Sequence, residues 1–249
     1  MFDGDSHTKE IYHKFFDPNT RDFEPDDLFR SKEVWDILVE EYNTSFTRFT
    51  APSFIDFFYT WRFSNYPIFK VLSSDIPKAN IYHTMCTGYA GLLGCVAKLK
   101  FKSPLILTEH GIYTHERKIE ISQSDWLYTN EDDIAAQKKL SYFKSWWMNK
   151  FTGLGKMTYD YSDDITTLHQ GNKKKQIELG ADSELISIVP NGINKQKLTS
   201  KLDNNLIYKK TKKMTIALVG RVVPIKDIKT FIKSISYLKH HFTDFEVLI

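Results

Sequence analysis

The chain has 249 residues, with 34 basic and 31 acidic side chains that leave a formal net charge of +3. Apolar residues make up 41% and charged residues 26%, which is typical of a globular protein and excludes a disordered one. The near-balance of charge gives no reason to expect a nucleic acid or an anionic membrane as a partner. No stretch approaches the roughly 20 apolar residues of a membrane-spanning helix. The polar start, MFDGDSHTKE, lacks a signal-peptide pattern.

Two cysteines, Cys86 and Cys95, are too few for a disulfide framework, so the expected compartment is the reducing cytoplasm. A metal site that joined these cysteines with His83 and His110 would match no common zinc spacing. No metal and no bound cofactor are therefore expected.

Two helical segments are expected in the first third of the chain. Ser31 can cap a helix over residues 32–41, in which apolar side chains recur every three and four positions. Residues 52–72 are rich in aromatic side chains, and four of these share one helical face: Phe54, Phe57, Phe58 and Trp61. This pattern favours a buried helical pair over an aromatic site for a ligand.

After Pro77, short apolar strands alternate with helices. The alternation predicts an α/β fold with a mainly parallel sheet, and the nearly all-apolar second strand predicts helices on both sheet faces. Gly153 and Gly155 are expected to break or kink the longest helix. Strands are expected at residues 80–84, 104–109, 164–168 and 186–189, and helices at residues 87–97, about 131–159 and 172–179.

A second pattern begins after a polar, lysine-rich stretch. Residues 199–213 are interpreted as a linker that joins a first lobe (residues 1–198) to the start of a second domain (residues 214–249). A single βαβ unit cannot supply the core of a domain, so the chain is expected to be cut off at its C-terminus. This unit comprises a buried strand at residues 215–219, an amphipathic helix at residues 227–242 and a strand at residues 245–249.

Ligands of parallel sheets bind beyond the carboxyl ends of the strands, which directs attention to the loops at those ends. In the second domain, Gly220 and Arg221 follow a strand, and Lys226 comes just before a helix that Asp227 can cap. Two cations and a helix N-terminus suit a diphosphate, although charge alone leaves a solvated loop equally open. The glycines of a Walker loop and of a dinucleotide fingerprint are missing.

In the first lobe, Glu109 and His110 follow the second strand, and Gly111 lets a ligand approach the backbone. A carboxylate and an imidazole at this position can hydrogen-bond sugar hydroxyls or transfer a proton. The alternative is that backbone groups at the strand end satisfy both side chains. The loops at residues 83–88 and 191–192 are further candidates by their position.

Four segments resemble the GT-B glycosyltransferases of family 4, and within that family the PelF-like branch of exopolysaccharide enzymes. The segments are HTMCTGYAGLLG (83–94), LTEHGIYTHER (107–117), VPNGI (189–193) and LVGRVVPIKDIKTF (218–231). The resemblance implies a GT-B fold, here an incomplete Rossmann-like first lobe and the first βαβ unit of a second Rossmann-like domain. It implies a retaining transferase that moves a hexose from a nucleotide sugar, with a UDP-sugar expected, to a growing exopolysaccharide.

The resemblance also assigns roles to residues. It implies that Arg221 and Lys226 bind the donor diphosphate and that His110, with Glu109 beside it, lies near the sugar as a catalytic residue. The remaining donor-side candidates are Gly220, Asn191 and Gly192, and the acceptor-side candidates are His83, Gly88, Tyr113 and Arg117.

The sequence also departs from the family pattern. The Gly-rich loop that opens the family and a later pair of glutamates are both missing, so this chain alone is not expected to turn over. An alternative is a non-catalytic, truncated copy that acts as a glycan- or subunit-binding module. The expected partners are a nucleotide-sugar donor, a glycan acceptor and a membrane-bound polysaccharide synthesis complex, which would hold the cytoplasmic chain at the inner face of the membrane.

Overall fold

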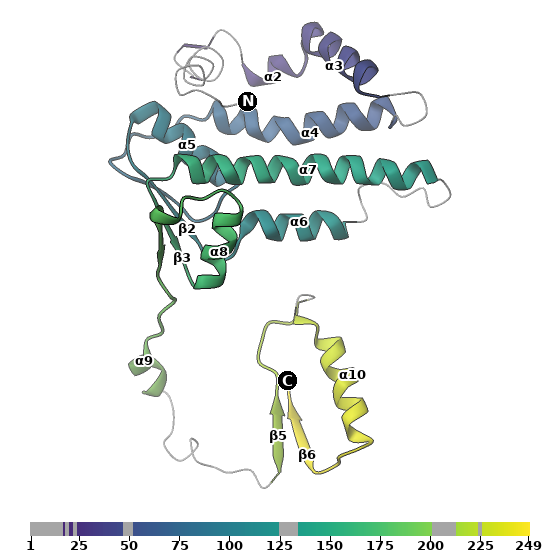
Figure 1. Ribbon diagram of the computed structural model, residues 1–249, viewed down its shortest axis with the longest axis vertical. Coiled ribbons are helices and arrows are strands. Elements are labelled where there is room, and N and C mark those ends of the chain that lie inside the picture. The colour runs from purple at the N-terminus through teal and green to yellow at the C-terminus, as the bar shows by residue number, and fades with distance from the viewer. Residues whose placement is uncertain are drawn as a thin grey trace. The chain divides into compact units, whose positions relative to one another are not determined.

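The computed structural model describes residues 17, 20–21, 24–46, 52–124, 134–200, 213–223 and 226–249, without the side chains of residues 25 and 134–141. The chain divides into two compact units, residues 1–191 and residues 192–249, which Figure 1 shows with their elements labelled. The expected linker, residues 199–213, lies largely outside the described residues, and the expected domain boundaries stay a prediction.

A four-stranded parallel sheet, in the order β1-β2-β3-β4, forms the centre of the first unit. Leu107 in the second strand pairs with Thr84 on one side and with Ile165 on the other. The α/β class with parallel strands, an incomplete Rossmann-like arrangement, is thus confirmed. The strands are β1 (Tyr82–Thr84), β2 (Leu105–Glu109), β3 (Asp164–Thr167) and β4 (Ile186–Ile188).

The helices that connect these strands cover one face of the sheet. In β2, Leu105, Leu107 and Glu109 are buried, whereas Ile106 and Thr108 between them remain partly exposed. Right-handed crossovers between strands in sequential order place every connecting helix on the same side, so the second face receives none of them. The prediction that helices cover both faces of the sheet is therefore wrong for the described residues. The connecting helices are α5 (Tyr89–Phe101), α6 (Tyr113–Gln123), α7 (Ile134–Tyr161) and α8 (Gln170–Glu178).

The longest helix, α7, runs through Gly153 and Gly155 without interruption, so the expected break is wrong. A Cβ atom at Gly155 would lie 2.5 Å from Oγ1 of Thr114 on α6. This glycine is therefore explained by the close approach of a neighbouring helix. The sequence analysis did not predict α6, whose first turn carries the residues that follow Gly111.

A helical layer precedes the sheet and comprises α2 (Pro25–Leu28), α3 (Lys32–Ser45) and α4 (Phe54–Leu72). Ser31 caps α3 as expected, since its Oγ accepts a hydrogen bond from the backbone N–H of Val34 at 3.1 Å. α4 lies alongside α7 (Figure 1), and Trp146 Nε1 donates to Ser64 Oγ at 3.0 Å. The expected helical pair exists, but it is only partly buried.

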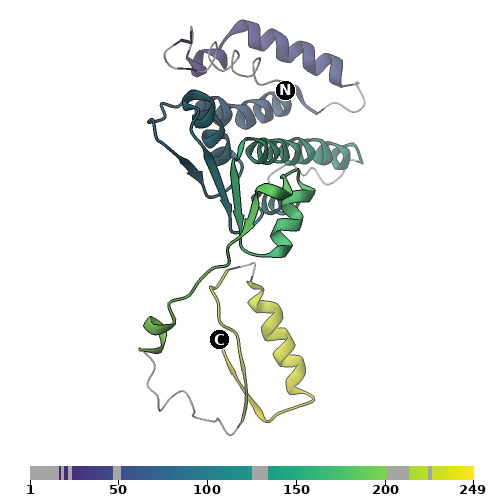
Figure 2. The ribbon, with the colours of Figure 1, turned by 60° about the vertical axis from the view of Figure 1, so that its left-hand side comes forward.

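The second unit contains a short helix, α9 (Lys195–Thr199), followed by a βαβ unit with two parallel strands. Figure 2 shows its longer helix, in yellow, alongside both strands. The burial expected for residues 215–219 is wrong, because one helix covers only one face; Ala217, for example, is exposed, and Val219 is 95% exposed. The elements of this βαβ unit are β5 (Met214–Ala217), α10 (Ile228–Lys239) and β6 (Phe245–Leu248).

The small-residue face of α5 allows a close approach to α7, and this contact can be tested at Gly91. An added Cβ atom there would lie 2.7 Å from Cγ2 of the buried Thr158 and closer still to its Oγ1. We expect Gly91→Ala to lower the free energy of unfolding by about 1–3 kcal/mol, since the packed helices cannot separate freely. Urea titration followed by tryptophan fluorescence measures this, because all five Trp residues lie in the first unit.

The control is Gly153, which is exposed and has no atom within 4 Å of an added Cβ. Gly153→Ala is expected to stabilise α7 by about 0.5–1 kcal/mol through helix propensity. The second substitution Thr158→Ala should recover part of the loss at Gly91. Equal effects of the two glycine substitutions would contradict the close contact between α5 and α7.

Lys150 on α7 lies in the interface with α4 and is largely removed from water. Its Nζ donates a hydrogen bond to Asn65 Oδ1 at 2.9 Å. Burial disfavours the charged ammonium and lowers the pKa of Lys150 to about 8. The charged form at neutral pH therefore weakens the folded state.

We expect Lys150→Met to raise the free energy of unfolding at pH 7 by about 1–2 kcal/mol, below the limit of about 3 kcal/mol that the pKa shift sets. Between a pKa of about 8 in the folded chain and the ordinary pKa near 10.5, the unfolded chain binds more protons. The stability of the unsubstituted chain therefore rises with pH across this window, and the advantage of the variant shrinks. Urea unfolding at several pH values measures the trend.

The control for this experiment is Lys156→Met, because the Lys156 side chain is 61% exposed. It should change stability by no more than about 0.5 kcal/mol. A Lys150→Met variant that is less stable at pH 7, or whose advantage grows with pH, would contradict the assignment.

Candidate functional site

The carboxylate of Glu109 is buried at the carboxyl end of β2. The residue is 0% exposed, and three groups donate hydrogen bonds to it. Oε2 accepts from the Tyr159 hydroxyl of α7 at 2.7 Å and from Nε2 of Gln176 on α8 at 2.9 Å. Oε1 accepts from the backbone N–H of Tyr113 at 3.4 Å, at the start of α6. One side chain thus joins a strand to three helices.

The protonation of Glu109 follows from this environment. Burial raises the pKa of its carboxyl group, and the hydrogen bonds from Gln176, Tyr159 and Tyr113 oppose part of that shift. Burial and the carboxylate also raise the pKa of the Tyr159 hydroxyl, so the phenol stays a donor. In this structure Glu109 reaches no solvent, and its geometry is that of a residue that holds its surroundings in place.

The turn that follows Glu109 carries His110. Its backbone is held from two sides, and the His110 imidazole points into solvent. Asn172 Nδ2 on α8 donates to the carbonyl oxygen of His110 at 3.2 Å, and Glu109 holds the start of α6. A Cβ atom at Gly111 would meet the carboxylate of Glu116, the end of an exposed and flexible side chain. The His110 side chain is exposed on this fixed backbone, where it is available to a ligand.

Three of the expected acceptor-side residues come together beside this turn. The Tyr113 ring covers Gly88, which has a φ of +75° and directly precedes α5. An added Cβ atom at Gly88 would lie 2.5 Å from Cε1 of Tyr113. The Arg117 guanidinium lies 5.1 Å from the centre of the same ring, a cation–π contact. Arg117 also pairs with Glu120 at 2.6 Å.

The fourth acceptor-side candidate, His83, lies on the other face of the sheet. It is in β1 beside Ile106, in the row that the connecting helices leave open. Its Nε2 is 2.8 Å from the Thr108 hydroxyl, which is 2.5 Å from the Thr166 hydroxyl. These contacts form a polar row across three strands and do not reach the His110 turn.

In the second unit, the loop between β5 and α10 carries the two cations expected to bind a diphosphate. Gly220 follows the strand, and the aliphatic part of Lys226 lies against it, with Cδ 3.8 Å from the position of an added Cβ. Arg221 is the next residue, so both cations belong to one short stretch of surface. Both are exposed, and within the described residues neither forms an ion pair.

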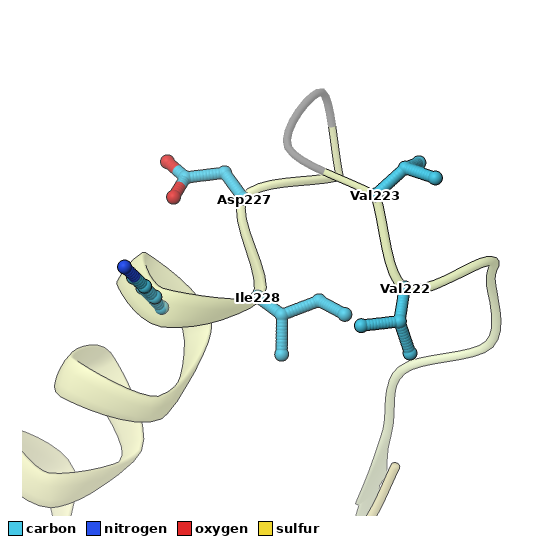
Figure 3. A pocket seen from close by; sticks show the side chains of 5 residues that line it. Val222, Val223, Asp227 and Ile228 are labelled. Carbon is cyan, nitrogen blue, oxygen red and sulfur yellow. The ribbon is translucent and has the colours of Figure 1, made fainter.

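The helix start beside these cations is already capped by an acid. Asp227, in the left-handed region with φ of 44°, accepts a hydrogen bond from the Thr230 N–H at 3.3 Å. A hollow of about 360 Å³ lies beside this helix start. Figure 3 shows its lining residues, with Val222 and Ile228 facing one another and the Asp227 carboxylate directed away from them. The walls of the hollow are mainly apolar. Lys229 on α10 is the cation among the lining residues, so an anion in the hollow would meet Lys229, whereas Arg221 and Lys226 lie outside the lining.

The remaining donor-side candidates, Asn191 and Gly192, lie on either side of the division between the two units. Both are exposed, and no atom lies within 4 Å of an added Cβ at Gly192. The structure places them beyond the carboxyl end of β4 and shows no specific contact that would define a site. Their role stays a prediction.

Three functional residues were missed by the sequence analysis: Asn172, Tyr159 and Gln176, which hold the His110 turn. The signal available was Glu109 itself, because a buried carboxylate requires donors. Nothing in the spacing of the sequence identifies the donors, which come from helices 50 and 67 residues further along the chain.

Within the described ranges, no group of three or more His, Cys, Asp and Glu side chains could hold a metal ion. None of the described helices combines the length and apolar character needed to cross a membrane.

Comparison with known proteins gives one family. The family model described as "Domain of unknown function (DUF3492)" matches residues 3–184, which is well over half of the chain. The matched range includes Glu109 and the three helices that donate hydrogen bonds to it, up to Gln176, and it ends before the second unit. No curated protein matches the chain.

The structural role of Glu109 predicts a clear difference between two substitutions. Glu109→Ala leaves three buried donors without an acceptor and is expected to lower the free energy of unfolding by at least about 3 kcal/mol. Glu109→Gln keeps the shape and one carbonyl acceptor, so its loss should be clearly smaller. Urea unfolding followed by tryptophan fluorescence measures both.

The pH dependence separates the charge from the shape. Because the pKa of Glu109 is raised in the folded chain, its stabilising contribution is complete below the ordinary carboxyl pKa and is lost as the pH rises through the raised value. The stability difference between the unsubstituted chain and Glu109→Gln should therefore shift in favour of the variant from pH 4.5 upward. A difference that stays constant, or that shifts the other way, would argue against a buried, destabilised carboxylate.

Proposed function

Since the chain belongs to the DUF3492 family, whose domain is found in glycosyltransferase-like proteins, we propose that it forms part of a retaining hexosyltransferase. The proposed donor is a nucleotide sugar, with a UDP-sugar preferred, and the proposed acceptor is a growing exopolysaccharide of the kind made by PelF-like GT-B enzymes. No cofactor beyond the donor is proposed. Partnership with a membrane-bound polysaccharide synthesis complex, and a cytoplasmic place at its inner face, belong to the same proposal.

The observation that carries this proposal is the loop after β5. The Lys226 side chain lies beside Gly220, with Cδ 3.8 Å from the position of an added Cβ, and Arg221 is the next residue. Both cations are exposed, and neither forms an ion pair within the described residues. A diphosphate carries the charge that such a pair would neutralise. As the bond between the sugar and the diphosphate breaks, negative charge grows on the leaving group, and fixed cations stabilise that charge more than the ground state.

In the first unit, the proposal gives His110 the contact with the saccharide. Its backbone is held by Asn172 and, through Tyr113, by Glu109, so the exposed imidazole starts from a fixed position. An imidazole can donate to or accept from a sugar hydroxyl without losing its own backbone contacts. Glu109, which the sequence analysis paired with His110 as catalytic, is proposed as a positioning residue because its oxygens are buried and engaged.

The donor assignment is tested by replacing both cations of the loop. Calorimetric titration of the chain with UDP and with UDP-glucose should show binding of both. The affinity should fall about tenfold or more in the double variant Arg221→Gln with Lys226→Gln, since each charge-assisted hydrogen bond contributes about 1.5–3 kcal/mol. The binding should also weaken with rising salt concentration.

A charge-matched control is the pair Lys233→Gln with Lys239→Gln on α10, whose side chains are exposed and do not line the hollow of Figure 3. This variant should bind UDP within about twofold of the unsubstituted chain. The donor assignment fails if the chain binds neither nucleotide, or if both double variants lose the same affinity.

A further inference from the structure

A second feature of the first unit, apart from the sheet, is a hollow of about 280 Å³ between residues 29–31, α3 and α4. Figure 1 shows α2 and α3 above α4. The size is close to the lower end of small-ligand sites, about 300 Å³. It suits one sugar-sized ring better than a dinucleotide.

Aromatic rings form the walls of this hollow. Phe29 and Trp61 pack with ring centres 5.3 Å apart. Trp35 packs against Phe58 at the same distance, 5.3 Å, with the ring planes at 60°. These contacts hold the rings in place before any ligand arrives. Trp35 is 46% exposed, so part of its surface remains accessible to a ligand.

Two cations complete the lining. Arg30 lies on the short connection between α2 and α3, Lys32 is the first residue of α3, and both are exposed. Within the described part of the chain, neither forms an ion pair. Asp26, which interacts electrostatically with Arg30, is engaged by Lys70 at 3.1 Å. Among the described residues, those that line the hollow include no acidic side chain, so its charge favours an anion.

From these aromatic rings and charges, we infer that the hollow between residues 29–31, α3 and α4 binds an acidic saccharide, with one uronate ring against the aromatic lining and its carboxylate on Arg30 and Lys32. The C–H face of a pyranose is apolar and packs flat against an indole ring, while its hydroxyls stay in water. A guanidinium can bind a carboxylate through two parallel hydrogen bonds. This inference rests on the proposed function only for its choice of saccharide as the ligand class.

The test is calorimetric titration of the chain with trigalacturonate, with maltotriose as the neutral saccharide and UMP as the nucleotide. Trigalacturonate should bind, and maltotriose should bind at least about tenfold more weakly. The double variant Arg30→Gln with Lys32→Gln should bind trigalacturonate about tenfold or more weakly. Its remaining binding should also depend less on salt concentration than that of the unsubstituted chain. Trp35→Ala should weaken trigalacturonate binding similarly, whereas Trp35→Phe should keep most of it.

Matched controls separate this site from the fold and from the donor loop. Lys174→Gln with Lys175→Gln removes two exposed cations of α8 and should leave trigalacturonate binding within about twofold. Arg221→Gln with Lys226→Gln should also leave it unchanged, so the inference and the proposed donor site can fail separately. Circular dichroism confirms that each variant is folded, and the cation pair, being exposed, tests the site even if Trp35→Ala unfolds.

Three results would overturn the inference. One is an unsubstituted chain that does not bind trigalacturonate, and another is equal binding of trigalacturonate and maltotriose. The third is an equal loss of trigalacturonate affinity in the double variant of Arg30 and Lys32 and in the α8 control variant. That result would indicate a general attraction of the saccharide to positive charge. Stronger binding of UMP than of trigalacturonate, lost in the Arg30 and Lys32 pair, would assign the hollow to a nucleotide instead.

Discussion

The arrangement of the first unit depends on one buried carboxylate. Glu109 ends β2, and its two oxygens accept hydrogen bonds from α6, α7 and α8. A carboxylate without donors would be very unfavourable in this environment, so the three helices can change position only if the group is left unsatisfied. The chemistry of the strand end thereby fixes where the next turn begins. The exposed His110 depends on an acid that never reaches the solvent.

The topology of the sheet explains why such a clamp forms on one side only. Strands in sequential order, joined by right-handed crossovers, send α5, α6, α7 and α8 to the same face. The buried row therefore collects apolar side chains and Glu109, while the open row carries the polar contacts of His83 with Thr108 and Thr166. His83 and His110, an acceptor-side and a catalytic candidate in the sequence analysis, belong to different environments for this reason.

Much of this fold could be predicted from local patterns. The strands, the Ser31 cap and the helix before Gly180 each follow from apolar spacing and capping residues within a few positions. The unbroken course of α7 could not, because Gly155 reflects the approach of Thr114 on another helix. The same limit applies to the site: Glu109 and His110 were visible at a strand end, but their partners Tyr159 and Asn172 are set by tertiary packing.

Burial also changes what each candidate residue can do. A carboxylate and an imidazole in adjacent positions suggest shared chemistry, but alternation along β2 sends Glu109 into the core and leaves His110 at the surface. The acid can then affect a reaction only through the backbone that it holds. In the second unit, the cations Arg221 and Lys226 are the reverse case, exposed and without acidic partners in the described residues. The affinity of that loop for an anion would therefore depend directly on the charges of these two side chains, and rising salt concentration would lower it.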